Sequence, residues 1–192
     1  MLKDTYDFCI DPGHGGKDSG ATSDGLREAD VVLKVAMATT ARLYASGYSA
    51  VMTRTRDRDL SLRERADWAN KMKVRAFVSI HANADPDPDL PGDREACGYE
   101  VWHHMDSSQG RILARSLVDA LSGALPDELN RGVRETGTLY VLRVTVMPAA
   151  LVELGFIDRA ATRDRMRTDA YLVAVGAAIA DGARAWLENV VA

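Results

Sequence analysis

Apolar and polar residues recur along the chain with two periods, one typical of buried strands and the other of amphipathic helices. Short apolar runs bounded by turn residues predict six β-strands, at residues 6–10, 49–53, 76–80, 98–102, 139–142 and 149–154. Apolar residues at three- and four-residue spacing predict four helices, at residues 28–46, 61–73, 107–124 and 168–187. Strands that alternate with helices are typical of an α/β sandwich with a mostly parallel sheet.

Local signals mark the ends of several predicted elements. Ser61 and Glu64 have the spacing of a capping box, which predicts the start of the second helix. Gly47 is a C-terminal stop for the first helix. Three prolines among acidic residues predict a loop at residues 85–95. The chain contains no internal repeat and no low-complexity linker, so we expect a single catalytic domain over residues 1–192.

Composition and charge narrow the possible partners. Hydrophobic residues make up 46% of the chain and charged residues 27%, which is ordinary for a globular protein. The net charge of -4 argues against a protein that binds nucleic acid through a basic surface. The first ten residues lack the apolar stretch of a secretory signal peptide, and the longest apolar run, residues 171–180, is too short to span a bilayer. We therefore expect a monomer that binds no nucleic acid, does not insert into a membrane and is synthesised in the cytoplasm.

The two cysteines give little indication of function. Cys9 lies in an apolar run and is expected to be a buried, small hydrophobic residue. Two unpaired thiols are favoured over a disulfide between Cys9 and Cys97, although the sequence does not give the distance between them. Neither cysteine belongs to a C-x-x-C pair, which argues against a zinc site built from thiolates.

Histidine and carboxylate side chains occur where the predicted strands end. His14 follows the first strand, His81 comes directly after the third, Glu153 lies at the end of the last, and Glu28 begins the first helix. Sites in open α/β sheets form outside the carboxyl ends of the strands, so we expect these four side chains to converge on one edge. A single histidine at a strand end is more often structural or at the surface. The prediction of a site therefore depends on all four residues occurring together.

These four residue types suit a zinc hydrolase. A catalytic zinc site uses three protein ligands, two histidines and one glutamate being a known set, and leaves one position for water. The metal lowers the pKa of water to about 7 and polarises the scissile carbonyl. A further carboxylate can accept the water proton and return it to the leaving amine. No H-E-x-x-H motif is present, so the ligands would come from distant segments.

Two polar residues near the predicted site, Asp11 and Arg54, each allow two interpretations. Asp11 either orients His14 through a hydrogen bond or forms the turn before Pro12. Arg54 belongs to a charge run after the second strand, which is either a solvated surface or a brace for the site through a carboxylate pair. Residues 135–138 are expected to form a loop that lines the groove.

Five segments, in this order, resemble the zinc-dependent N-acetylmuramoyl-L-alanine amidases of the Amidase_3 family, and the match covers nearly the whole chain. The segments are IDPGHGG at residues 10–16, TRTRD at 53–57, LRERADWAN at 62–70, SIHAN at 79–83 and PAALVELGF at 148–156. The resemblance implies that His14, Glu28 and His81 hold zinc and that Glu153 is the catalytic carboxylate. It implies a three-layer sandwich in which helices cover both faces of a twisted, mostly parallel six-stranded sheet.

The activity that the resemblance implies is hydrolysis of the amide bond between N-acetylmuramic acid and L-alanine in peptidoglycan. The chain departs from the family pattern at residues 31–33, where an asparagine is usual, and at Asp158 and Arg159, where a Ser-Asn pair is common. Some periplasmic relatives carry an inserted helix that plugs the zinc site. Here Trp102 leads almost directly to the helix predicted from residue 107, so the resemblance implies an open site.

Two other functions compete with this one. A non-catalytic wall-binding module on the same fold would have a broken ligand set or lack Glu153, whereas this chain keeps all four residues. A zinc peptidase or deacetylase would cut a different amide and is distinguished by its products. For the biological role, a phage endolysin released through a membrane lesion is favoured, with the catalytic domain of a larger secreted autolysin and a spore or mother-cell lysis enzyme as alternatives.

Overall fold

A six-stranded sheet forms the centre of this computed structural model, which describes residues 5–85 and 97–191. Across the sheet the strands follow the order β4 (Ala50–Met52), β1 (Phe8–Pro12), β5 (Ala76–Asn83), β8 (Ala149–Phe156), β6 (Tyr99–His104) and β7 (Asn130–Thr136). Neighbouring strands are parallel except for β6 and β8, which pair antiparallel. The predicted six-stranded, mostly parallel sheet is confirmed.

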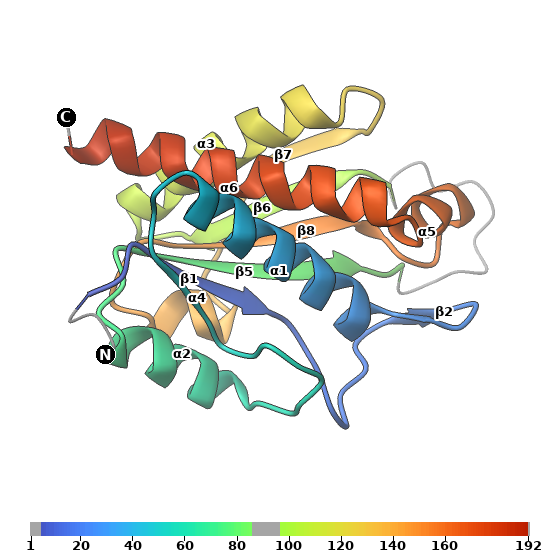
Figure 1. Cartoon of the computed structure of the whole chain (residues 1–192), viewed down its shortest axis with the longest axis horizontal. Coiled ribbons are helices and arrows are strands. Elements are labelled where there is room, and N and C mark those ends of the chain that lie inside the picture. The colour runs from blue at the N-terminus through green and yellow to red at the C-terminus, as the bar shows by residue number, and fades with distance from the viewer. Residues whose placement is uncertain (1–4, 86–96, 192) are drawn as a thin grey trace.

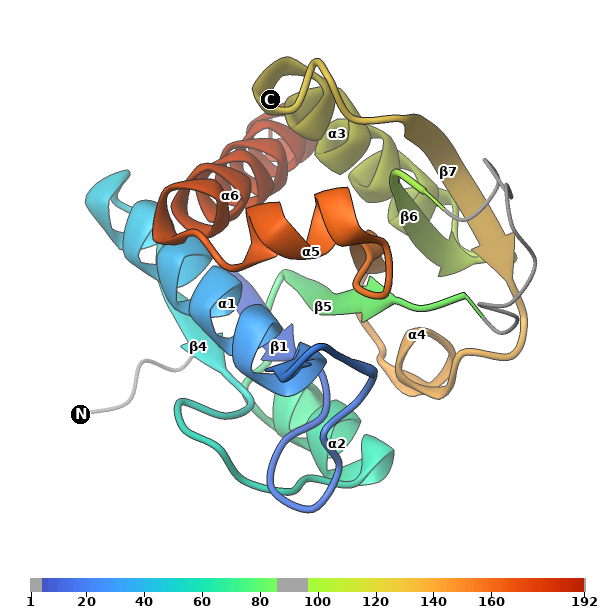
Figure 2. The same ribbon diagram turned by 90° about the vertical axis from the view of Figure 1, so that its right-hand side faces the viewer.

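Helices cover both faces of the sheet, so the chain forms three layers (Figures 1 and 2). One face carries α1 (Glu28–Ala45), α3 (Ser108–Ala124), α5 (Ala160–Met166) and α6 (Asp169–Val191). The other carries α2 (Leu62–Lys71) and α4 (Tyr140–Val144). A small hairpin, β2 (Thr22–Ser23) and β3 (Leu26–Arg27), precedes α1.

The strands divide their side chains between two cores because successive residues point to opposite faces. Phe8 and Ile10 pack into the large core beneath α1, α3 and α6. Cys9 and Phe77 pack into the smaller core with residues of α2 and α4, and Cys9 forms no disulfide with Cys97. The smaller core covers only part of its face of the sheet, so the rest of that face is available for a site.

Helix α6 is long and apolar enough, by length and composition, to cross a membrane. In the fold it packs along α1 and α3, and 56% of its most apolar stretch is buried. Val175 and Ile179 lie in the large core. The central helix of a globular domain also needs an apolar composition, and the burial of α6 against α1 and α3 accounts for its apolar residues here.

Two predicted elements were wrong. Residues 140–142 lie in helix α4, with Leu139 as its N-cap, instead of in a strand, and the sixth strand is β7, which includes residues expected to form a loop. Val141 and Leu142 are both buried, but a four-residue apolar run does not distinguish a strand from a helical turn. Strand β7 lies at the sheet edge with mostly polar residues and Gly132, so it lacks the alternation that identifies a half-buried strand.

Other boundaries follow the local signals. The capping box of α2 is present: Oγ of Ser61 accepts from the amide of Glu64, and the Glu64 carboxylate accepts from the amide of Ser61. The hairpin β2–β3 and helix α5 are too short to show a period and were not predicted. Three residues join β6 to α3, which leaves no room there for an inserted helix. The predicted proline-rich loop lies, from residue 86 onward, outside the described residues.

Candidate metal centre

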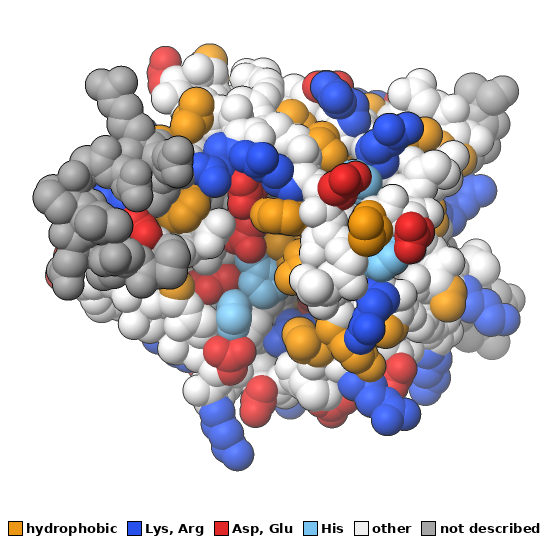
Figure 3. Space-filling model, turned by 180° about the vertical axis from the view of Figure 1, so that it is seen from behind, with side chains coloured by type: hydrophobic (Ala, Val, Ile, Leu, Met, Phe, Trp, Pro, Cys, Tyr) orange, Lys and Arg blue, Asp and Glu red, His pale blue; other side chains and the backbone are white. Residues whose placement is uncertain are grey.

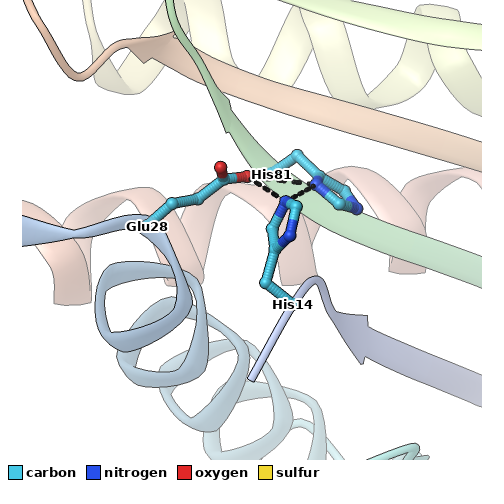
Figure 4. A group of neighbouring side chains, drawn as sticks. All are labelled: His14, Glu28 and His81. Carbon is cyan, nitrogen blue, oxygen red and sulfur yellow. Dashed lines mark hydrogen bonds and ion pairs between the residues drawn. The ribbon is translucent and has the colours of Figure 1, made fainter. Parts of the chain in front are cut away.

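Three side chains from distant segments meet near the carboxyl ends of β1 and β5. His14 lies in the loop after β1, Glu28 is the first residue of α1, and His81 lies within β5, which extends beyond its predicted end. Nε2 of His14 and Nδ1 of His81 each lie 3.1 Å from Oε1 of Glu28, and the two nitrogens are 3.2 Å apart. Figure 4 shows the three side chains pointing toward one another.

The three ligand atoms have the separation that a tetrahedral zinc ion requires. Zinc lies about 2.0–2.1 Å from such ligands, which places any two of them roughly 3.3 Å apart. The observed separations of 3.1–3.2 Å match this value, and the donor set of two imidazoles and one carboxylate is one that zinc prefers. Glu28 is buried and both histidines are partly exposed, so the group is open to solvent on one side.

Two backbone amides hold the Glu28 carboxylate in place. The amide of Ala82 donates to Oε1 and the amide of Ala21 donates to Oε2, each at 2.9 Å. Burial alone would raise the pKa of Glu28, but hydrogen bonds and charges from His14 and His81 outweigh burial and hold that pKa far below its usual value. Glu28 is therefore ionised, as a metal ligand must be.

Asp18 fixes the orientation of the His14 ring. Oδ2 of Asp18 lies 2.8 Å from Nδ1 of His14, and Oδ1 accepts from the amide of Gly20. Burial lowers the pKa of His14, but the carboxylates of Glu28 and Asp18 raise it more, so the net shift is upward. A carboxylate on the second ring nitrogen is the usual partner of a metal-binding histidine, and it directs Nε2 toward Glu28.

Asp11 plays neither of the roles that the sequence suggested. It lies within β1 instead of a turn, and the carboxylate that bonds to the His14 ring is that of Asp18. Its buried carboxylate accepts from Nη1 of Arg65 at 2.9 Å, from Ser79 Oγ at 2.7 Å and from Thr53 Oγ1 at 2.5 Å. Nη2 of Arg65 also donates to the carbonyl oxygen of His14 at 2.7 Å, so Asp11 supports the metal loop through Arg65.

Arg54 braces the same loop through carbonyl oxygens, and not through the carboxylate pair considered from the sequence. The buried guanidinium donates to the carbonyl oxygens of Pro12, Gly13 and Ala29. Burial lowers the pKa of Arg54, and the neighbouring Arg65 lowers it further. The loop after β1 is thus held to α1 and α2 by two buried guanidinium groups.

Replacing Arg65 by methionine is expected to reduce the free energy of unfolding by about 3–5 kcal/mol, because it leaves the buried Asp11 charge without its main partner. The matched control is Arg63→Met in the same helix, where the side chain is 79% exposed and its ion pair with Asp67 contributes at most about 1 kcal/mol. Urea denaturation of both variants measures the difference. Equal losses would show that the buried pair is not a principal stabilising contact.

Two glycines allow the metal loop to approach the histidines closely. A Cβ atom at Gly13 would lie 2.2 Å from Cε1 of the His81 ring, and one at Gly20 would lie 2.5 Å from Oε2 of Glu28. Gly20 also has a φ of +63°, which favours glycine.

Gly13→Ala is therefore expected to displace the His81 ring and weaken metal binding more than about tenfold, since correct ligand placement determines metal affinity. Gly123→Ala in α3 is the control, because a Cβ atom there meets nothing within 4 Å. Competition titration with a zinc-binding dye measures both affinities. Unchanged affinity in Gly13→Ala would show that the loop relaxes without moving the ligand.

Glu153 lies beside this group on the same face of the sheet. In the register of β8 it pairs with His81 on one side and with Glu100 on the other. Its Oε2 atom is buried and has no hydrogen-bond partner among the described residues. Burial raises the pKa of Glu153 well above its usual value, and the charges of Glu28 and Glu100 add to the shift. A buried carboxyl group with a raised pKa beside a group of possible metal ligands is a candidate for proton transfer.

One face of the molecule is hollowed where histidine side chains gather. Figure 3 shows histidine and acidic side chains together in this hollow, with basic side chains directly beside them. Sequence reasoning named the three converging residues and Glu153, but it assigned no role to Asp18 or Glu100. The spacing of Asp18, four residues after His14 in a glycine-rich loop, was the signal available for the first of these.

Comparisons with known proteins agree with the geometry. The family model described as N-acetylmuramoyl-L-alanine amidase matches residues 8–185. The amidase LytC of Bacillus subtilis is 36% identical over 90% of this chain, and the endolysin of Bacillus phage SPP1 is 34% identical over 90%. The solved structure of the amidase AmiC2 of Nostoc punctiforme superposes with a TM-score of 0.87 at 35% identity, covering 98% of this chain and 99% of that one.

The relatives differ in how much of their own length the match includes. It includes 34% of LytC and 63% of the phage endolysin, whereas it includes nearly all of the AmiC2 structure. The similarity therefore spans the whole of one folded unit that also occurs within longer proteins. Family model, relatives and fold agree, and the chain belongs to the N-acetylmuramoyl-L-alanine amidase family.

Proposed function

We propose that this chain is a zinc-dependent N-acetylmuramoyl-L-alanine amidase, which hydrolyses the amide bond between N-acetylmuramic acid and L-alanine in peptidoglycan. His14, Glu28 and His81 hold the zinc, and Glu153 is the catalytic carboxylate. One observation carries the proposal: three ligand atoms lie within 3.2 Å of one another beside a buried carboxyl group with a raised pKa. The described residues then form one catalytic unit.

The metal and Glu153 have separate roles in the hydrolysis. When bound, zinc polarises the scissile carbonyl and lowers the pKa of water to about 7. Glu153 accepts a proton from the water while the water oxygen attacks the lactyl carbonyl carbon. The carbon–nitrogen bond then breaks, and Glu153 returns the proton to the nitrogen of L-alanine. The products are the lactyl carboxylate of muramic acid and a free α-amino group on the peptide.

A product assay tests the proposal. Purified peptidoglycan digested with the protein is expected to gain L-alanine amino termini, detected by labelling free amines, without gaining reducing sugars. Metal analysis of the purified protein is expected to give about one zinc per chain. New amines on other stem residues or on glucosamine would instead identify a peptidase or a deacetylase and contradict the assignment.

We further propose that the site of action is the bacterial cell wall. The names of the relatives support this, because they include a probable cell wall amidase of Staphylococcus saprophyticus and a phage endolysin. The chain then acts as the catalytic unit of an endolysin or an autolysin. The expected monomeric state and the absence of nucleic-acid binding stay predictions.

A further inference from the structure

The face of the sheet that carries Glu153 continues across β6 and β7. Glu100 on β6 pairs directly with Glu153, and Trp102, two residues further along β6, pairs with Arg134 on β7. Paired residues and alternate residues of a strand point to the same face. Glu100, Trp102 and Arg134 therefore extend the same surface away from the metal centre, toward the edge of the sheet.

A buried carboxylate organises two arginines on this surface. Oε2 of Glu100 lies 2.8 Å from Nε of Arg131 and 3.5 Å from Nε of Arg134, and Oε1 accepts from Nε1 of Trp102 at 3.2 Å. The guanidinium of Arg131 also lies over the ring of Phe156, 5.3 Å from its centroid. One carboxylate thus faces two guanidinium groups, in a chain whose overall charge is -4.

Arg134 is the member of the cluster that is accessible to a ligand. Its side chain is 47% exposed, and within the described part of the chain its Nη1 and Nη2 atoms form no hydrogen bond. Its Nε atom lies 3.5 Å from Oε2 of Glu100. The two terminal amino groups of a guanidinium bind a carboxylate in a bidentate manner, which gives both affinity and orientation.

We propose that Arg134 binds a free carboxylate of the stem peptide, on the leaving side of the scissile amide, and that Glu100 and Arg131 position it. This inference rests on the proposed function. The only carboxyl group of N-acetylmuramic acid is consumed in the scissile amide, so free carboxylates lie on the peptide. The residue after L-alanine is a D-glutamate linked through its side chain, which leaves its α-carboxyl free or amidated.

The distances on the sheet suit this residue. Arg134 lies two strand spacings across the sheet and two residues along the strands from Glu153, which places the two backbones about 12 Å apart. Two extended peptide residues span about 7 Å, and the arginine side chain reaches back toward Glu100 over the rest. A carboxylate one residue beyond L-alanine thus falls within reach of Arg134.

The test uses two disaccharide tetrapeptides that differ only in whether the α-carboxyl of the second residue is free or amidated. The wild-type protein is expected to show about tenfold higher kcat/KM for the free carboxylate. Arg134→Gln is expected to abolish this preference by slowing the free form alone, and Arg134→Lys, which keeps the charge but not the bidentate geometry, to retain part of it. The control is Arg115→Gln, at an exposed position of α3, which lies on the other face of the sheet.

The outcomes separate this inference from the function on which it rests. Cleavage of both substrates at equal rates by the wild-type protein, or an unchanged preference in Arg134→Gln, overturns the carboxylate subsite and leaves the amidase assignment intact. An equal loss on both substrates in Arg134→Gln also overturns it, because that result indicates a general defect. Cleavage of neither substrate by the wild-type protein overturns both proposals.

Discussion

Glu153→Gln is expected to retain its zinc and lose at least about 1,000-fold in kcat, because the amide side chain cannot accept the water proton or donate it to the leaving nitrogen. Glutamine has nearly the same shape, so the packing of β8 against β5 and β6 is preserved. The measurement combines kcat on a soluble muropeptide with zinc content. The control is Asp119→Asn at an exposed position of α3, on the other face of the sheet.

Loss of zinc along with activity in Glu153→Gln would mean that this carboxylate contributes to metal binding instead of proton transfer. Full activity would remove Glu153 from the mechanism altogether. Either result would also require a new explanation for the buried Oε2 atom, which has no partner among the described residues.

His81→Ala is expected to abolish both zinc binding and hydrolysis. The substitution removes one of the three ligand atoms that form the corners of a triangle with sides of 3.1–3.2 Å. Loss of a residue that merely orients a ligand weakens metal binding by about 10- to 100-fold, so loss of a ligand should exceed 100-fold. Equilibrium dialysis and thermal unfolding with added zinc give two independent readings.

Zinc at 100 times its dissociation constant should stabilise the wild-type protein by about 2.7 kcal/mol and leave His81→Ala unchanged. His104→Ala is the matched control, since His104 lies further along β6 and outside the metal-binding group. A normal response to zinc in His81→Ala would show that the ion binds elsewhere in the chain.

Much of the fold was predictable because the long helices and central strands carry clear periods. Helix α1 and strands β1, β5 and β8 appear within a few residues of their expected bounds. The convergence of His14, Glu28 and His81 was also predictable, since parallel strands bring their carboxyl ends to one edge of the sheet. Strand β7 was missed because an edge strand need not bury either face.

The partner of His14 could not be predicted because it depends on the path of the loop. His14, Gly15 and Gly16 all have positive φ angles, which turn the chain back so that Gly15 bridges to Asp18. Only that reversal brings the Asp18 carboxylate to the imidazole. The same loop leaves Asp11 in the strand, facing Arg65. Sequence spacing gives the candidates for such a contact, and backbone angles decide between them.

Arg65 gives helix α2 a part in the metal centre that its position alone does not suggest. The helix contributes no ligand, yet this guanidinium is bound at once to a buried carboxylate of β1 and to the backbone of a histidine that faces the ion site. Any opening that lifts the helix from the sheet therefore frees that histidine as well. Under the proposed function, undocking of α2 and release of zinc are therefore linked equilibria, and bound zinc stabilises the docking of a helix that contributes no ligand to it.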